Sequence, residues 1–170
     1  ENSDLYEFVK KNEDLTEDVK CLIIYQMLEI LQSLKKRKIL HNDIKMENFL
    51  MKSVSPPTIL LTDFDFAEII NKSSCQKRGT IPYMAPEILN DEQHDYEADI
   101  WSLGICAFFL LFNIFPFDFN QYKLFDKSHI MSCIEKNELV RPEADVSDDA
   151  WNLVSALLQK DQNERITVEK

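Results

Sequence analysis

The sequence predicts a mostly helical domain that carries one small β-hairpin. Three observations lead to this fold class. Apolar residues recur at helical spacing near the N-terminus, two short β-prone runs follow with a proline-containing turn between them, and most of the second half again has helical periodicity. With 170 residues, 45% of them hydrophobic, the chain can bury one sizeable core. We therefore expect residues 1–170 to form a single domain.

The first predicted element is an amphipathic helix over residues 16–38. Thr16 is its candidate N-cap, Glu17 and Asp18 suit the positive end of the helix, and the run "KKRK" suits the negative end. The apolar positions that define its buried face are Val19, Leu22, Ile23, Met27, Ile30, Leu31 and Leu34.

A β-hairpin is predicted next, from the runs "FLMK" and "TILLT". The segment "SVSPP" between them predicts a turn, because proline cannot donate a ladder hydrogen bond. The polar stretch "HNDIKMEN" enters this hairpin and "DFDF" leaves it, so the two stretches are expected to lie close together.

The second half is predicted to be helical over residues 97–112, 126–136 and 147–159, with a further helix beginning at Thr167. Residues 97–112 are apolar on all sides, which predicts a fully buried helix. The apolar stretch that contains them is interrupted by Asn113 and Pro116, and it is too short and broken to cross a bilayer. Ser147 is the candidate N-cap of the helix that follows it.

Composition excludes several classes of function. The net charge of −11 argues against nucleic-acid binding, which depends on clustered Lys and Arg. Four widely spaced cysteines indicate neither a zinc site nor a disulfide framework, and only two glycines occur, so a glycine-rich phosphate loop is absent. The first residues are polar and acidic, unlike a signal peptide. We expect a cytoplasmic protein without nucleic-acid or membrane partners.

The stretch "HNDIKMENFL" concentrates charged and amide groups just before the first strand. Asn48 and, across the hairpin, Asp63 offer hard oxygen donors of the kind that Mg²⁺ takes alongside phosphate oxygens. Asp43 is then free to accept a proton from an attacking hydroxyl, and Lys45 to neutralise charge on a transferred phosphoryl group. Positioning and charge stabilisation of this kind make up nearly all of the catalysis of phosphoryl transfer.

Five motifs, in order, resemble those of the eukaryotic protein kinases. "HNDIKMEN" is similar to the catalytic loop HRDxxxxN, and "DFD" stands where the family has DFG. "GTIPYMAPE" resembles the end of the activation loop, "DIWSLG" the start of the buried helix, and "NERIT" the arginine-bearing turn near the end of the domain. The resemblance implies a kinase-like large C-terminal lobe, truncated at both ends, with the small lobe outside these residues.

The resemblance also implies an ATP- and Mg²⁺-dependent kinase that phosphorylates Ser and Thr hydroxyls of proteins. Asp43 corresponds to the catalytic base, Asn48 and Asp63 to the metal ligands, and Lys45, which also contacts the nucleotide phosphates, to the mark of Ser/Thr specificity. Leu50 would support the adenine, backed by Phe49, Met51, Cys106 and Leu110.

A substrate platform is implied as well. Thr80 would hydrogen-bond Asp43 and Lys45, and Glu87 would pair with Arg165. Activity of the isolated chain is not expected, because half of the nucleotide clamp would be missing.

The resemblance implies three further roles. Asp99 would bond the backbone of the catalytic loop, His41 and Phe64 would stack, and Asp4 would offer an acid to the ribose or to a substrate arginine. His94 and His129 match no motif, and we expect them at the surface.

The segments "GTIPYMAPEIL", "FDKSHIMSCIEKNE" and "VSDDAWNLVSALLQKDQNERIT" are most similar to the calcium/calmodulin-dependent branch of the family. Kinases of this branch often choose hydroxyls near a basic residue, and Glu47, which we also expect among the cofactor-binding residues with Lys45, Asn48, Leu50 and Asp63, would contact that base. The expected partner is therefore a protein or peptide substrate, including basic ones.

Two replacements depart from the family pattern. Asn42 stands in place of the arginine that binds a phosphorylated activation loop, which disfavours control through Ser73 or Ser74. Asp65 replaces the DFG glycine; aspartate tolerates positive φ, but a second carboxylate would attract metal or repel phosphates. These departures leave an alternative open, in which the chain is a pseudokinase or a docking module.

Overall fold

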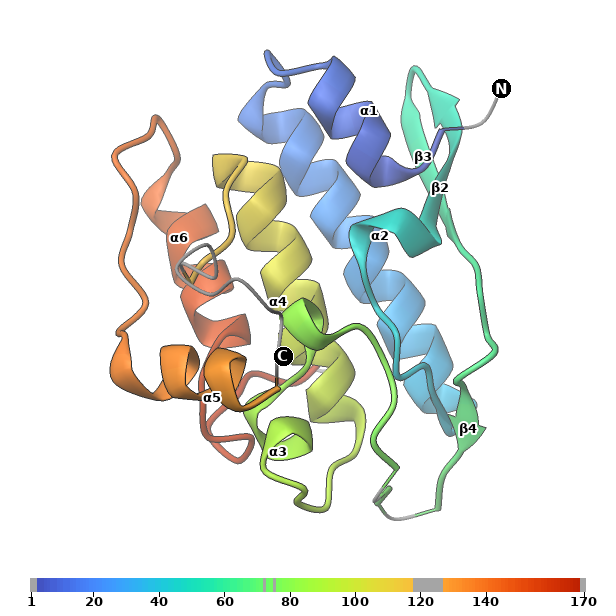
Figure 1. The fold of residues 1–170 in the computed structure, drawn as a ribbon. Coiled ribbons are helices and arrows are strands. Elements are labelled where there is room, and N and C mark those ends of the chain that lie inside the picture. Colours follow the sequence, from blue (N-terminus) through green and yellow to red (C-terminus); the bar gives the residue numbers. More distant parts are fainter. Residues whose placement is uncertain (1–2, 72, 75, 118–126, 169–170) are drawn as a thin grey trace.

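The computed structural model describes residues 3–71, 73–74, 76–117 and 127–168. They form a mostly helical fold with two small two-stranded antiparallel sheets (Figure 1). The elements are α1 (Leu5–Lys11), α2 (Glu17–Lys36), β1 (Ile39–Leu40), η1 (Met46–Asn48), β2 (Phe49–Val54), β3 (Pro57–Leu61), β4 (Glu68–Ile69), η2 (Ile81–Tyr83), α3 (Pro86–Leu89), α4 (Tyr96–Phe112), α5 (Lys127–Lys136) and α6 (Asp148–Leu157), where η denotes a 3₁₀ helix. The mostly helical fold class is confirmed.

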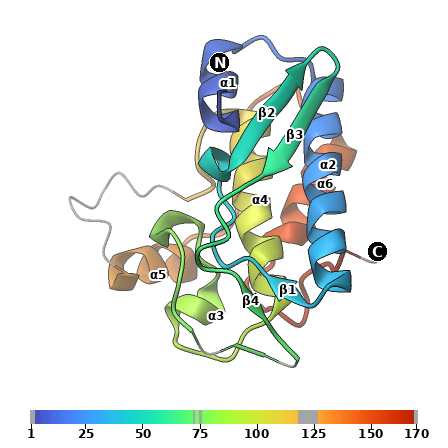
Figure 2. The ribbon, with the colours of Figure 1, turned by 90° about the vertical axis from the view of Figure 1, so that its right-hand side faces the viewer.

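The centre of the core is α4, in which every residue from Ala98 to Leu111 is buried. Asp95 caps its N-terminus, and Asn113 ends it in the left-handed conformation that asparagine tolerates better than most residues. The helices α2 and α6 both pack against α4, and α1 packs against β2 and η1 (Figure 2). This arrangement gives α4 no solvent-facing side along most of its length, as its uniform hydrophobicity predicts.

The predicted hairpin is present as β2 and β3, with Phe49 opposite Leu61 and Leu50 opposite Leu60. It is longer than expected, because β2 continues to Val54 and β3 begins at Pro57. A proline is compatible with this place because the first residue of a strand need not donate to the ladder. The second sheet, β1 with β4, pairs Ile39 with Ile69 and was not predicted.

The predicted helix boundaries differ from the observed ones by at most two residues for α2, α4, α5 and α6. Ser147 caps α6, since its side chain accepts a hydrogen bond from the amide of Ala150. Thr167 and Val168 are not helical, and the remainder of the helix expected there lies outside the described residues. Within the described part of the chain, no helix is long and apolar enough to cross a membrane.

The expectation that His94 lies at the surface was wrong, because its exposed fraction is only 2%. Its backbone exchanges two hydrogen bonds with Ser74, at N···O distances of 2.7 and 3.0 Å. This isolated bridge pairs two segments far apart in the sequence and draws both residues into the interior. Ser74, which was considered as a phosphorylation site, is only 4% exposed.

Candidate active site

The stretch from His41 to Lys45 forms a loop between β1 and η1, and Asp99 of α4 binds its backbone. The buried carboxylate of Asp99 accepts hydrogen bonds from the backbone amides of His41 and Asn42, at 2.7 and 3.0 Å. Burial raises the pKa of Asp99 to about 7, although both amides favour the carboxylate. The contact predicted between Asp99 and the loop backbone is therefore present.

Asp43 is the hub of this loop and is 4% exposed. Thr80 donates its hydroxyl to Asp43 Oδ1 at 2.7 Å, and Lys45 donates from Nζ to Asp43 Oδ2 at 2.7 Å. Asn48 donates from Nδ2 to Asp43 Oδ2 at 3.1 Å and to its backbone carbonyl at 2.8 Å. Lys45 also donates to the Thr80 hydroxyl at 3.0 Å, which gives the contacts predicted for Thr80.

These contacts keep Asp43 ionised. Burial pushes the pKa of Asp43 upward, but the hydrogen bonds from Lys45, Thr80 and Asn48 and the charge of Lys45 outweigh it and lower the pKa below its usual value. Each carboxylate oxygen has two lone pairs, and Oδ1 accepts only from Thr80 among the described residues. One acceptor position on an ionised, oriented carboxylate thus remains for a hydroxyl group.

Asp63 follows the hairpin and is exposed, with φ of 61°. Positive φ occurs at Asp63 and not at Asp65, so the residue that replaces the family's glycine has no need of the left-handed conformation here. The amide of Asp65 lies 3.5 Å from Asp63 Oδ1. Both carboxylates are exposed, so their charges are solvated.

The donor chemistry fits Mg²⁺. Asn48 uses its amide nitrogen on Asp43, which leaves Oδ1 as a hard oxygen donor, and Asp63 supplies a carboxylate. No cluster of three or more His, Cys, Asp or Glu side chains that would hold a metal occurs in the described residues. A magnesium ion held by these two residues would therefore share its remaining positions with phosphate or water, as Mg²⁺ commonly does.

His41 is fully buried and supports the loop. Its ring meets the ring of Phe64 edge-on with centroids 4.8 Å apart, and its Nε2 lies 3.2 Å from the carbonyl oxygen of Thr62. Burial lowers the pKa of His41, although the hydrogen bond with the Thr62 carbonyl opposes this shift. The imidazole is therefore neutral at physiological pH. The predicted contact between His41 and Phe64 is present and links the catalytic loop to the DFD segment.

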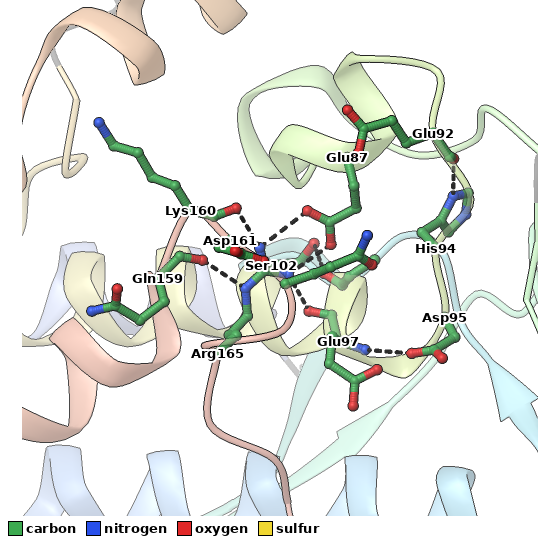
Figure 3. Close-up of polar contacts among 12 residues, drawn as sticks. Glu87, Glu92, His94, Asp95, Glu97, Ser102, Gln159, Lys160, Asp161 and Arg165 are labelled. Atoms are coloured by element: carbon green, nitrogen blue, oxygen red, sulfur yellow. Dashed lines mark hydrogen bonds and ion pairs between the residues drawn. The ribbon is translucent and has the colours of Figure 1, made fainter.

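The predicted pair of Glu87 and Arg165 is also present, and each residue is 3% exposed (Figure 3). The two guanidinium nitrogens donate to the two carboxylate oxygens at 2.7 and 3.0 Å. Arg165 also donates to the carbonyls of Gln159, Glu97 and Lys160, and its guanidinium lies 5.1 Å from the ring of Trp101. The pair ties α3 to the turn after α6.

The remaining predicted residues lie around the hairpin. Leu50 is half-buried on the outer face of β2, opposite Leu60, which is 48% exposed. Glu47 is exposed and accepts a hydrogen bond from the Tyr83 hydroxyl at 3.3 Å. Asp4 caps α1 by accepting a hydrogen bond from the amide of Glu7 at 2.7 Å, and its contact with a ribose or a substrate arginine stays a prediction.

One functional contact was missed from the sequence. Asn42 has φ of 65° and is buried, and its amide nitrogen donates to the carbonyl of Phe66 at 3.0 Å and to the carboxylate of Glu68 at 3.1 Å. The sequence showed only that an arginine was missing at this position. The positive φ was detectable in principle, because asparagine is enriched in that conformation.

A family model described as "Protein kinase domain" matches residues 1–170. Among curated proteins, an Aurora kinase of Candida glabrata is 32% identical over 170 residues, which cover 98% of this chain and 45% of that protein. An Aurora kinase of Eremothecium gossypii is 33% identical over 171 residues, which cover 99% and 44%. The serine/threonine-protein kinase D3 of Mus musculus is 30% identical over 177 residues, covering 99% and 19%. The chain thus spans less than half the length of each of these relatives.

Proposed function

Because this chain belongs to the protein kinase family, we propose that it is the catalytic large lobe of a protein Ser/Thr kinase. One relative is named a serine/threonine-protein kinase and two are named Aurora kinases, and the family generally uses ATP and Mg²⁺. The observation that carries the proposal is the hub at Asp43, where a base, a cation and an amide converge with Thr80.

In the proposed reaction, the substrate hydroxyl oxygen bonds to the γ-phosphorus of ATP while the bond to the ADP leaving group breaks. Asp43 orients this hydroxyl and accepts its proton at Oδ1, the oxygen with an open acceptor position. Lys45, held between Asp43 and Thr80, stabilises negative charge on the transferred phosphoryl group. Asn48 and Asp63 would hold Mg²⁺, which would supply positive charge to neutralise the phosphates of ATP. Leu50 supports the adenine on the outer face of β2.

The finer assignments rest on sequence. The amino-acid sequences of the motifs favour the calcium/calmodulin-dependent branch. The net charge of −11 and the exposed carboxylate of Glu47 favour basic substrates. The two glycines of this chain cannot form a phosphate-binding loop, so we propose that a small lobe outside these residues completes the nucleotide clamp. A cytoplasmic location accords with the absence of a disulfide pattern.

A second candidate function is a kinase-shaped binding module with little catalysis. Asp65, the exposed second aspartate of the DFD segment, favours this candidate. An extra carboxylate two residues from Asp63, the proposed metal ligand, disfavours bound phosphates.

The test is Mg²⁺-dependent transfer of phosphate from ATP to a basic Ser/Thr peptide by the full-length protein. We expect Asp63→Asn to lower the rate by about 10²–10³-fold, as removal of one preorganised electrostatic group does. Asp14→Asn, which removes an equal charge from the exposed turn between α1 and α2, should leave the rate unchanged.

Asp65→Gly separates the two candidates. A faster rate than that of the parent protein would identify Asp65 as a brake on a working kinase. If the parent transferred no phosphate and even Asp65→Gly bound no ATP, the kinase proposal would be refuted. The second candidate, a binding module, would then be the better explanation.

A further inference from the structure

A groove of about 400 Å³ lies between α3, α5 and the turn at residues 160–163. It is remote in sequence from the loop that contains Asp43, but one of its walls is α3, which begins within the segment "GTIPYMAPE". The pair of Glu87 and Arg165 joins α3 to the opposite wall, so the groove has a rigid base.

The lining combines an apolar floor with an acidic rim. Pro86, Met131 and Ile134 supply apolar surface from α3 and α5. The exposed carboxylates of Glu92, Glu135 and Asp161 stand around it.

The rim carries an excess of negative charge. Lys160 is the one cation among the described lining residues, and its Nζ donates to the carbonyls of Glu135 and Asn137 at 3.4 and 2.9 Å, at the C-terminal end of α5. The carboxylates of Glu92 and Glu135 have no hydrogen-bond or ion-pair partner among the described residues. The rim thus holds three carboxylates and one ammonium group. Backbone oxygens already engage that ammonium group, and Asp161 Oδ1 accepts hydrogen bonds from Asn163 at 2.9 Å.

We propose that this groove docks a segment of a partner protein in which Lys or Arg side chains flank an apolar side chain. Its volume lies within the range of about 300–1,000 Å³ that is typical of ligand sites. A cation would meet the rim carboxylates while its apolar neighbour covers Met131 and leaves water. The sign of the charge excludes a nucleic-acid backbone. The inference goes beyond the proposed kinase activity and does not require phosphate transfer.

The test is direct binding, measured by fluorescence anisotropy with the full-length protein in the absence of ATP. The probe is a short labelled peptide in which arginines alternate with leucines, and a second peptide replaces every arginine by glutamate. The groove variant combines Glu92→Lys with Glu135→Lys. The matched control combines Glu13→Lys with Asp14→Lys, which makes the same charge change on the exposed turn between α1 and α2.

We expect the parent to bind the arginine–leucine peptide and not the glutamate peptide. The groove variant should bind at least about ten-fold more weakly, and the control pair should stay within about two-fold of the parent. Met131→Gln should weaken binding without changing its salt dependence, because it alters only the floor.

Three results would overturn the inference: no binding by the parent, equal binding by the groove variant and the parent, or equal weakening in both charge variants. The last result would show attraction to the overall negative charge. Far-UV circular dichroism of each variant confirms that it is folded. The binding measurement needs no catalysis, so its result can be interpreted even if the kinase proposal fails.

Discussion

Separating Glu87 from Arg165 should destabilise the protein more than any change at its exposed ion pairs. Both side chains are almost fully buried, and the guanidinium donates to five acceptors, two on Glu87 and three backbone carbonyls. Glu87→Ala would leave a buried charge that only the carbonyls of Gln159, Glu97 and Lys160 compensate. We expect this variant to lose about 3–5 kcal/mol of unfolding free energy, as removal of one partner of a buried pair does.

Arg165→Met should cost at least as much, because it leaves the Glu87 carboxylate buried without a cation and also removes the donors to three carbonyls. The double variant should cost less than the sum of the two single changes, since neither charge is then left unpaired. Coupling of about 0.5–3 kcal/mol is the range measured for contacting residues.

The assay is urea denaturation of the full-length protein, followed by tryptophan fluorescence. Trp101 is a suitable reporter because its ring lies 5.1 Å from the Arg165 guanidinium. The control is Arg141→Met, which breaks the pair with Asp148, an acid whose side chain is 85% exposed. We expect this control to cost less than about 1 kcal/mol.

The reasoning would fail if Arg165→Met cost no more than Arg141→Met. It would also fail if the effects of Glu87→Ala and Arg165→Met were additive, because additivity would mean that the two side chains do not stabilise each other.

Two further predictions concern the catalytic loop. Gly79→Ala should cost about 1–3 kcal/mol and slow phosphate transfer, because Gly79 has φ of 114° and a Cβ there would lie 2.3 Å from the carbonyl oxygen of Asn42; urea titration with no loss would contradict this. Asp99 has its pKa raised to about 7 from 3.8 in the folded protein, so its contribution to stability is complete below about pH 4 and is lost as the pH rises through 7. The free energy of unfolding of the parent, relative to that of Asp99→Asn, should therefore fall by about 2–3 kcal/mol between about pH 5 and about pH 8. A constant difference in denaturation midpoints would refute this.

The long helices were predictable because each has a local signal that agrees with its tertiary role. The helix α2 combines an apolar stripe with charges suited to both ends, and α4 is apolar on every side, which only a central helix can satisfy. The helix α1 has seven residues and depends on packing against β2 and η1, so its few apolar positions gave a weak signal. The strands β1 and β4 have only two residues each, so they carry no local sequence pattern, and their pairing depends on the tertiary fold.

Within the candidate site, the contacts of Asp43, Asp99 and Arg165 were predictable because the motifs fix their order and spacing. Asn42 was recognised only as a replaced arginine. Its bond to Glu68 depends on how the chain turns after Phe64, which no residue type specifies. The same applies to His94, whose burial follows from a backbone bridge to Ser74 and not from its own side chain.

The two replaced motif residues have opposite consequences in this fold. Asn42 occupies a left-handed conformation that asparagine favours, and its side-chain amide donates hydrogen bonds to the carbonyl of Phe66 and to the carboxylate of Glu68, which hold the chain after the DFD segment directly. Asp65 adopts no positive φ, and its side chain is exposed. Its effect on the reaction is therefore electrostatic, because the backbone freedom that glycine would supply is not used at that position.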